Sequence, residues 1–305
     1  MIGFVINPES GGGKTGRIWS WLELELRKKF GSQFCAVLTE HPLHAAELTR
    51  QLLTDGVDTI VAVGGDGTLN EVVNGFFQDG KPVWAEAILG VLSLGTGADF
   101  IRTLNWPKDI PAALERLAQS KTKMIDLGLV HFTGVTGESC ERYFINIADF
   151  GIGGAVVDRV NRTTKRFGGR ISFMWSIMAT LFTFKNKVIT FSLDDGVWHT
   201  EVLNNFIVGN GRYFGSGLNP TPSAELDDGL FDVVTFGDFG FFEAIRNMSK
   251  LRRGEHLSHP KIHSYRAKKI AAHSEDLVFL DMDGECVGRV PVTIEIKTAA
   301  LRIMV

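Results

Sequence analysis

Short apolar runs alternate with amphipathic stretches through the first part of this chain of 305 residues. Each apolar run is a few residues long and rich in β-branched side chains, which is typical of strands buried on both faces. The stretches between them carry apolar side chains at helical spacing, as Trp19, Leu22 and Leu26 do. Strands that alternate with helices predict a mostly parallel sheet. The predicted strands are 2–6, 34–38, 60–63 and 87–93, and the predicted helices are 16–30 and 44–54.

The pattern changes near residue 124, where short β-like runs separated by turn residues begin to predominate. Such spacing predicts a mainly antiparallel β-sandwich. We therefore expect an α/β domain of residues 1–124 and a β-rich domain of residues 125–297, with a final strand at 298–305 that returns to the first domain. The β-like runs are 123–130, 143–148, 188–193, 200–208, 230–236, 269–272, 277–281 and 292–296.

A glycine-rich turn around Asp66 follows the third predicted strand. Thr68 and Glu71 have the spacing of a capping box, which predicts a helix start behind the glycines. The N-terminus of such a helix favours an anion, so an aspartate there indicates a nearby cation or a hydroxyl beside a phosphate. The alternative is an exposed Asp66 in a tight strand-to-helix turn. The predicted helix stripe is Leu69, Val72, Val73, Phe76 and Phe77.

Polar or glycine-rich loops follow all four predicted strands, at residues 7–14, 39, 64–68 and 94–99. Ligands of parallel sheets bind at the carboxyl ends of the strands, so these loops predict one site. The site is not a P-loop, because Pro8 occupies the position of the first P-loop glycine. It is not a dinucleotide fingerprint either, because Asn70 and Phe100 replace the last glycine.

Composition narrows the class of protein. A net charge of −3 argues against bulk nucleic-acid binding, so we expect no nucleic-acid partner. The three scattered cysteines predict a reducing compartment with neither disulfides nor a zinc site. The chain opens as a strand, and no apolar run reaches the ~20 residues that span a bilayer, so we expect a cytoplasmic protein without a signal peptide. His256, His259 and His263 lack metal-ligand spacing.

The Gly-Gly-Asp-Gly-Thr-Leu-Asn-Glu stretch at 64–71 resembles the signature of the diacylglycerol kinase catalytic domain. This superfamily includes sphingosine and ceramide kinases and the bacterial YegS/DgkB-like lipid kinases. The first loop, Asn-Pro-x-Ser-Gly-Gly, and the second glycine loop at 94–102 resemble family motifs as well. So do residues 210–217 and 222–232 and the Asp-Gly-Glu turn at 283–285, in the family's order and over nearly the whole chain.

The resemblance implies an NAD-kinase-like fold and ATP- and Mg²⁺-dependent phosphorylation of a lipid hydroxyl, with the nucleotide between the two domains. Glu285 would be the general base, Asp66 would position magnesium or the transferred phosphate, and Asp126 would join the magnesium and water network. Asp99 and Arg102 would lie on the substrate side. A structural metal would bind Glu225, Asp228 and the Leu230 carbonyl. The implied ATP contacts are Asn7, Gly11, Gly12, Thr39, Gly64, Gly65, Asp66, Gly67, Thr68, Asn70, Glu71, Gly95 and Thr96.

One position departs from the family pattern, because Ala98 replaces the usual asparagine of the second glycine loop. Alanine offers neither the donor nor the acceptor of an amide. Two other functions therefore stay open: a kinase of a soluble acceptor such as NAD, and an inactive nucleotide- or lipid-binding module. For Glu285 the alternative is an ordinary hairpin turn, and for Asp228 it is a loop cap.

The expectation of a lipid acceptor is supported by an uncharged run at 171–184 and by two groups of basic residues. An apolar helix beside cations suits an anionic membrane surface, whereas the alternative is a buried helix with solvated charges. We expect peripheral binding to the inner membrane face, with diacylglycerol as the acceptor and a sphingoid base or ceramide as alternatives. The resemblance also suggests a homodimer. The first basic group is Arg159, Arg162, Lys165, Arg166 and Arg170, and the second is Arg246, Lys250, Arg252 and Arg253.

Overall fold

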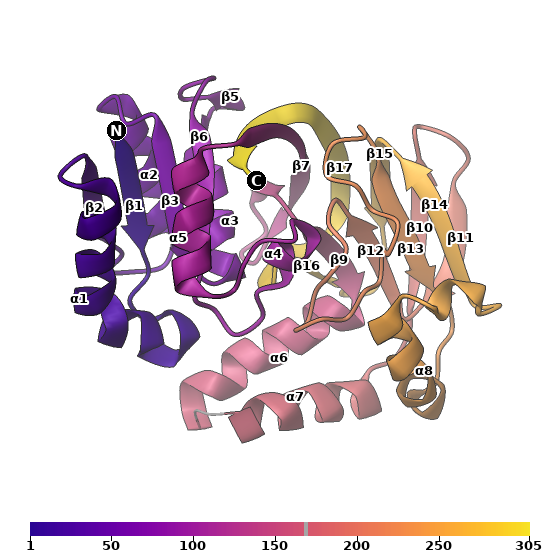
Figure 1. Ribbon diagram of the computed structural model, residues 1–305. Helices are drawn as coiled ribbons and strands as arrows, with labels where there is room; N and C mark the ends of the chain where they lie inside the picture. Colours follow the sequence, from indigo (N-terminus) through magenta and orange to yellow (C-terminus); the bar gives the residue numbers. More distant parts are fainter. Residues whose placement is uncertain (168–169) are drawn as a thin grey trace. The chain divides into compact units, whose positions relative to one another are not determined.

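The computed structural model describes residues 1–167 and 170–305, with side chains described outside 161–176. The side chains of residues 171–176 in the apolar run, and those of Arg162, Lys165, Arg166 and Arg170, therefore lie outside the described part. The chain divides into two compact units, one of residues 1–127 with 298–305 and the other of residues 128–297 (Figure 1).

A parallel sheet forms the centre of the first unit. Its strands lie in the order β2, β1, β3, β6 and the last residues of β17, and every pairing is parallel. All residues of β3 are buried, as expected of a central strand with helices on both faces. The strands are β1 (Ile2–Ile6), β2 (Phe34–Leu38), β3 (Thr59–Gly64), β6 (Ile88–Ser93) and β17 (Glu285–Met304).

Helices cover this sheet in two pairs (Figure 1): α1 contacts α5, and α2 contacts α3. Leu22 and Leu26 of α1 are fully buried, which agrees with the predicted stripe. The helices are α1 (Ser10–Phe30), α2 (His44–Thr54), α3 (Asp66–Gly75), α4 (Asp99–Thr103) and α5 (Ile110–Gln119), and a small hairpin joins β4 (Phe77–Gln78) to β5 (Lys81–Pro82).

Antiparallel strands build the second unit around an aromatic core. One group runs in the order β14, β13, β12, β9, β16 and β17, and another in the order β11, β10, β15 and β17. Phe206 from the first group stacks on Phe150 at 4.6 Å and meets Phe191 of the second edge-on at 5.0 Å. The strands are β7 (Thr122–Gly134), β8 (Ser139–Phe144), β9 (Ile147–Gly151), β10 (Lys187–Leu193), β11 (His199–Leu203), β12 (Asn205–Gly209), β13 (Phe231–Phe236), β14 (Ile262–Ala267), β15 (Lys269–His273) and β16 (Phe279–Met282).

The helices that accompany these strands are α6 (Ile152–Phe167), α7 (Arg170–Thr183) and α8 (Phe241–Arg253). A short 3₁₀ turn, η1 (His256–Ser258), follows α8. Within the described part of the chain, no helix combines the length and the apolar character needed to cross a membrane. The α/β unit and the antiparallel β unit confirm the predicted fold class.

Several predicted element limits are wrong. The helix behind the glycine turn begins at Asp66 and ends at Gly75, so Phe76 and Phe77 follow it, although both are buried. The predicted strand 200–208 is two strands, because the Asn204 N–H leaves the ladder and donates to the Phe236 carbonyl at 2.8 Å. The predicted strand 143–148 is also divided, at residues 145 and 146. Strand β14 was not predicted at all.

Candidate functional site

Two glycine loops meet backbone to backbone where β3 and β6 end. The Leu94 and Gly95 N–H groups donate to the Gly64 carbonyl at 2.8 and 3.1 Å. A Cβ on Gly95 would lie 2.5 Å from the Gly65 Cα, so no larger residue fits without moving a loop. The predicted convergence of these loops at the carboxyl end of the sheet is thus present within the first unit.

The Asp66 carboxylate joins the two loops. It accepts the Asp99 N–H at 3.2 Å and the Phe100 N–H at 3.4 Å, at the start of α4. A carboxylate in this place satisfies donors that a helix leaves without an internal partner. Burial raises the pKa of Asp66, and these backbone hydrogen bonds oppose the rise. Asp66 is therefore partly buried and held in place, unlike the exposed turn residue of the alternative interpretation.

The first loop is fastened to the same place by Asn7. Its Nδ2 donates to Thr68 Oγ1 at 3.0 Å, while its Oδ1 accepts the Glu9 N–H at 3.0 Å. A Cβ on Gly11, which has a φ of 62°, would lie 2.8 Å from the Leu94 carbonyl oxygen. The first loop therefore packs closely on the second glycine loop.

The other positions implied to contact ATP lie on the same elements. Thr39 follows β2 and donates its N–H to the Ile6 carbonyl at 2.8 Å. Thr96 is exposed in the loop before α4, and Asn70 is fully buried in α3. Glu71 accepts the Ala45 N–H at 3.2 Å at the start of α2. The predicted capping box is therefore wrong, because Glu71 reaches another helix and α3 has no side-chain cap.

Asp99 and Arg102 form an ion pair within α4, with Arg102 Nε 3.4 Å from Asp99 Oδ1. Asp99 is buried. Ala98 precedes them in a left-handed conformation with φ 52° and ψ 43°. The second glycine loop thus carries a non-glycine residue in a region that favours glycine or asparagine.

Asp126 is buried on β7, and its Oδ1 accepts the Ala299 N–H from β17 at 2.7 Å. This contact links two strands of the first unit. The catalytic role implied for Asp126 stays a prediction.

In the second unit, Glu285 begins β17 directly after a two-residue turn. Asp283 and Gly284 both have positive φ, 52° and 89°, which is the conformation of a tight type I′ hairpin. Glu285 Oε2 pairs with Arg142 Nη2 of β8 at 2.7 Å. The Glu285 side chain keeps 34% of its surface exposed and that of Arg142 keeps 15%. The arrangement offers an oriented carboxylate at the surface, and Arg142 is a residue that the sequence analysis missed.

Asp283 anchors this hairpin. Its carboxylate accepts the N–H groups of Ile145, Asn146 and Ile147, each at 3.0 Å. Asn210 Nδ2 donates to the Ile145 carbonyl of the same segment at 2.8 Å. Two of the sequence motifs thus hold the segment between β8 and β9, and Glu285 is positioned by that frame.

A carboxyl pair lies on the strand that leads into the hairpin, where Asp281 of β16 is directly paired with Asp149 of β9. Both are buried, and like charges placed opposite each other destabilise a sheet. Burial raises the pKa of Asp149 to about 7, and burial and the Asp149 charge raise that of Asp281. The pair therefore retains a proton well above the pH at which ordinary carboxyls lose theirs. Sequence spacing gave no signal of it, because the pairing depends on strand register.

The guanidinium of Arg266 lies at the structural metal site that the family resemblance implies. Asp228 Oδ2 pairs with Arg266 of β14, and Asp228 Oδ1 accepts the Leu230 N–H at 3.0 Å. Arg266 Nε also lies 3.6 Å from Asp232 Oδ2. Carboxylate oxygens suit Mg²⁺, but here a guanidinium already compensates them. The residues therefore do not fit a metal unless Arg266 is displaced, so we derive no role for a metal at Glu225, Asp228 and Leu230.

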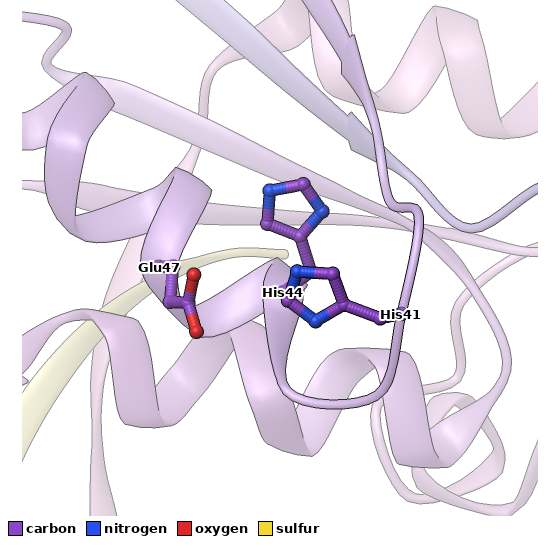
Figure 2. Close-up of side chains that lie close together, drawn as sticks. All are labelled: His41, His44 and Glu47. Atoms are coloured by element: carbon purple, nitrogen blue, oxygen red, sulfur yellow. The ribbon is translucent and has the colours of Figure 1, made fainter.

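Another cluster of metal-binding side chain types, His41, His44 and Glu47, lies where β2 leads into α2 (Figure 2). The two rings are stacked, with centroids 4.3 Å and planes 7° apart. Ring nitrogens bind metals through lone pairs in the ring plane, and stacked rings do not point these at one ion. His44 Nδ1 also accepts the Glu40 N–H at 3.0 Å. We therefore assign no metal to this cluster.

Two family models match this chain. Residues 1–130 match the diacylglycerol kinase catalytic domain, and residues 146–305 match the YegS C-terminal NAD kinase beta sandwich-like domain. A protein named diacylglycerol kinase from Staphylococcus saprophyticus is 31% identical over 287 residues, which cover 94% of this chain and 89% of that protein. One from Staphylococcus aureus is also 31% identical over 287 residues, covering 94% and 86%.

Solved structures share the fold. A diacylglycerol kinase from Bacillus anthracis has a TM-score of 0.71 at 20% identity, covering 99% of this chain and 96% of that one. An NAD kinase from Archaeoglobus fulgidus in complex with ATP has a TM-score of 0.53 at 14% identity, covering 100% and 94%. The NAD-kinase-like architecture expected from the sequence is therefore confirmed.

We predict that Asp149→Asn changes how stability depends on pH. The folded-state pKa of Asp149, about 7, exceeds its ordinary value of 3.8, so the parent loses stability as pH rises from about 4 to 7. The variant lacks this loss. Between pH 5 and 8 its free energy of unfolding should therefore rise relative to that of the parent by on the order of 2 kcal/mol, because one pKa unit corresponds to ~1.4 kcal/mol. Urea unfolding at several pH values measures it. The exposed Glu275→Gln serves as control, and parallel pH curves for parent and Asp149→Asn would contradict the prediction.

We also predict that Arg266→Gln creates a magnesium response. The substitution leaves Asp228 and Asp232 without their guanidinium, which should destabilise the fold by about 1–3 kcal/mol. Millimolar Mg²⁺, added without nucleotide, should then raise the melting temperature of the variant more than that of the parent. The neighbouring Lys268→Gln is the matched control. An equal magnesium effect in parent and variant would show that Arg266 does not substitute for a metal.

Proposed function

Because the chain belongs to the diacylglycerol kinase family, we propose that it transfers the γ-phosphate of ATP to the hydroxyl of a membrane lipid, with diacylglycerol as the acceptor. Membership of a kinase family implies the use of ATP. The observation that supports the proposal most directly is the meeting of two glycine loops around carboxylates at the start of two helices.

The glycine loops suit a polyphosphate. The first N–H groups of α3 have no preceding helical carbonyl as partner, and the helix dipole favours an anion there. The contact between Gly65 and Gly95 keeps side chains away from this backbone. Asn7 and Thr68 fix the first loop beside it through a 3.0 Å hydrogen bond. We assign the binding of the ATP phosphates to these loops.

The first unit also offers a fitting place for the Mg²⁺ of Mg·ATP. Asp66 Oδ2 and Asp99 Oδ2 lie 3.0 and 3.3 Å from the position that a Cβ on Gly97 would occupy. Two hard oxygen donors thus border a space that only glycine leaves open, which suits magnesium. When bound, the ion would neutralise charge on the transferred phosphoryl group. Asp66 and Asp99 would hold it, and we propose this role for Asp99 in place of the substrate-side one that the resemblance implies. Arg102 pairs with the other Asp99 oxygen, Oδ1. Asp126 is kept in this network on the family resemblance alone.

Glu285 is the proposed general base. Its carboxylate would accept the proton of the lipid hydroxyl as the oxygen attacks phosphorus. Arg142 holds one oxygen of this carboxylate at 2.7 Å, and Asp283 fixes the turn that carries it. These chain groups orient the base before the acceptor arrives. Since the acceptor is a membrane lipid, we propose that the protein acts peripherally at the inner face of the membrane.

We predict that Asp66→Asn and Glu285→Gln each lower kcat by at least about 100-fold, the scale of a lost general base or of lost charge positioning. The assay uses radiolabelled ATP, Mg²⁺ and diacylglycerol in detergent micelles. Asparagine keeps one oxygen to accept an N–H of α4, so Asp66→Asn should stay folded, which circular dichroism verifies. Glu275→Gln should retain parental activity.

The same assay separates the alternatives. Transfer of the radiolabelled phosphate to NAD and not to lipid would establish a kinase of a soluble acceptor. ATP binding without transfer to diacylglycerol, sphingoid base, ceramide or NAD would establish an inactive binding module. Parental activity in Glu285→Gln would remove Glu285 as the base while leaving the kinase itself intact.

A further inference from the structure

Three phenylalanine rings form a cluster outside the core, where the end of α7 lies beside the start of α8 (Figure 1). Phe182 meets Phe241 edge-on with centroids 5.5 Å apart, and Phe241 meets Phe242 at 5.3 Å. Yet Phe182 is 73% exposed and Phe242 is 84% exposed. Exposed aromatic side chains that form a contiguous patch mark an interaction surface, whereas single exposed apolar residues are normal on any protein.

The exposed face of α8 continues from this cluster and changes from apolar to basic. Its residues recur at helical spacing, so they share one side of the helix. Arg253 is paired with Glu255 at 2.8 Å. Neither Arg246 nor Lys250 forms a salt bridge with any described residue, although Glu255 interacts electrostatically with Lys250. The exposed positions are Phe242, Ile245, Arg246, Ser249, Lys250, Arg252 and Arg253.

The described end of α7 adds to the same surface. Met178, one turn before Phe182, is 38% exposed, and the exposed Lys185 follows the helix. The described end of α7 and the exposed face of α8 thus both present apolar side chains with cations next to them. Apolar side chains, phenylalanine among them, with cations beside them are the features of a helix that lies at the boundary between headgroups and acyl chains.

We propose that this surface, formed by Phe182, Phe241, Phe242, Ile245, Arg246 and Lys250, docks the protein on an anionic phospholipid bilayer. The aromatic side chains enter the boundary between headgroups and acyl chains, and the cations meet lipid phosphates. The assignment rests on the proposed function in one respect: the acceptor of a lipid kinase resides in a bilayer. It locates the contact on residues that the glycine loops and the Glu285 hairpin do not use.

Charge favours a bilayer over a second copy of the chain. A two-fold interface would bring the same patch onto itself, so Arg246 and Lys250 would meet a patch that carries two cations and no acidic side chain. Such like-charge contacts are unfavourable, whereas anionic headgroups compensate both residues. Cations that lie beside apolar rings are typical of a helix that binds a membrane peripherally.

The test is flotation of the full chain with vesicles of phosphatidylcholine, alone or with roughly 30% phosphatidylglycerol, at low salt. Phe182→Ser with Phe242→Ser should lower the partition coefficient at least about tenfold. Arg246→Gln with Lys250→Gln should lower it roughly 30-fold, about fivefold for each cation, and only on the anionic vesicles. Val197→Ser, at a residue 77% exposed between β10 and β11, and Lys268→Gln are controls that should bind like the parent.

Phosphoryl transfer to diacylglycerol in detergent micelles is measured on the same proteins, and the docking variants should keep parental rates there. Parental vesicle binding by both double variants would overturn the docking surface even if the kinase is active. If the docking variants lose vesicle binding but the parent shows no phosphoryl transfer in micelles, the docking surface is upheld and the proposed kinase activity is overturned. Loss of self-association by the phenylalanine variant, measured by sedimentation velocity with vesicle binding unchanged, would show an interface between copies and overturn the proposal.

Discussion

The first unit depends on the close approach of two backbones at Gly65 and Gly95. A single methyl group at Gly95 would stand 2.5 Å from the Gly65 Cα. Because the two loops touch, the starts of α3 and α4 come close enough for one carboxylate, Asp66, to bridge them. The same proximity gathers Asp66 and Asp99 around Gly97. The arrangement of charge in the unit therefore follows from a steric constraint on main-chain atoms.

The second unit reaches a comparable rigidity by another means. No close glycine pair is needed at its hairpin, because the Asp283 carboxylate gathers three N–H groups of the segment 145–147. Such a bonded carboxylate is stable while buried, since its charge is met by donors. Asp149 and Asp281 lie close by on β9 and β16, where burial raises the pKa of both carboxyls and repulsion from Asp149 raises that of Asp281 further. This strand pair thus holds a carboxyl pair that retains a proton, beside a turn whose carboxylate is bound by three N–H groups.

Sequence periodicity was sufficient for the parallel strands and the first three helices of the first unit, because the apolar pattern there reports burial directly. It was insufficient where tertiary partners compete with local ones. Thr68 and Glu71 have capping-box spacing, yet their partners are Asn7 and Ala45 from distant segments. The Arg142–Glu285 pair joins residues 143 positions apart, and the Asp149–Asp281 pair needs the register of β9 on β16. No short-range pattern contains that information.

Ala98 illustrates how backbone conformation changes the meaning of a motif. The residue is buried and left-handed, a conformation that costs an L-residue roughly 1–2 kcal/mol and that asparagine tolerates better than alanine. The asparagine usual in this family motif therefore has a conformational reason that is independent of amide hydrogen bonds to nucleotide or lipid. Asp66 holds the neighbouring N–H groups of Asp99 and Phe100, so the loop keeps its shape with alanine in place. The substitution on its own thus argues for a locally strained loop and gives little support to an inactive binding module.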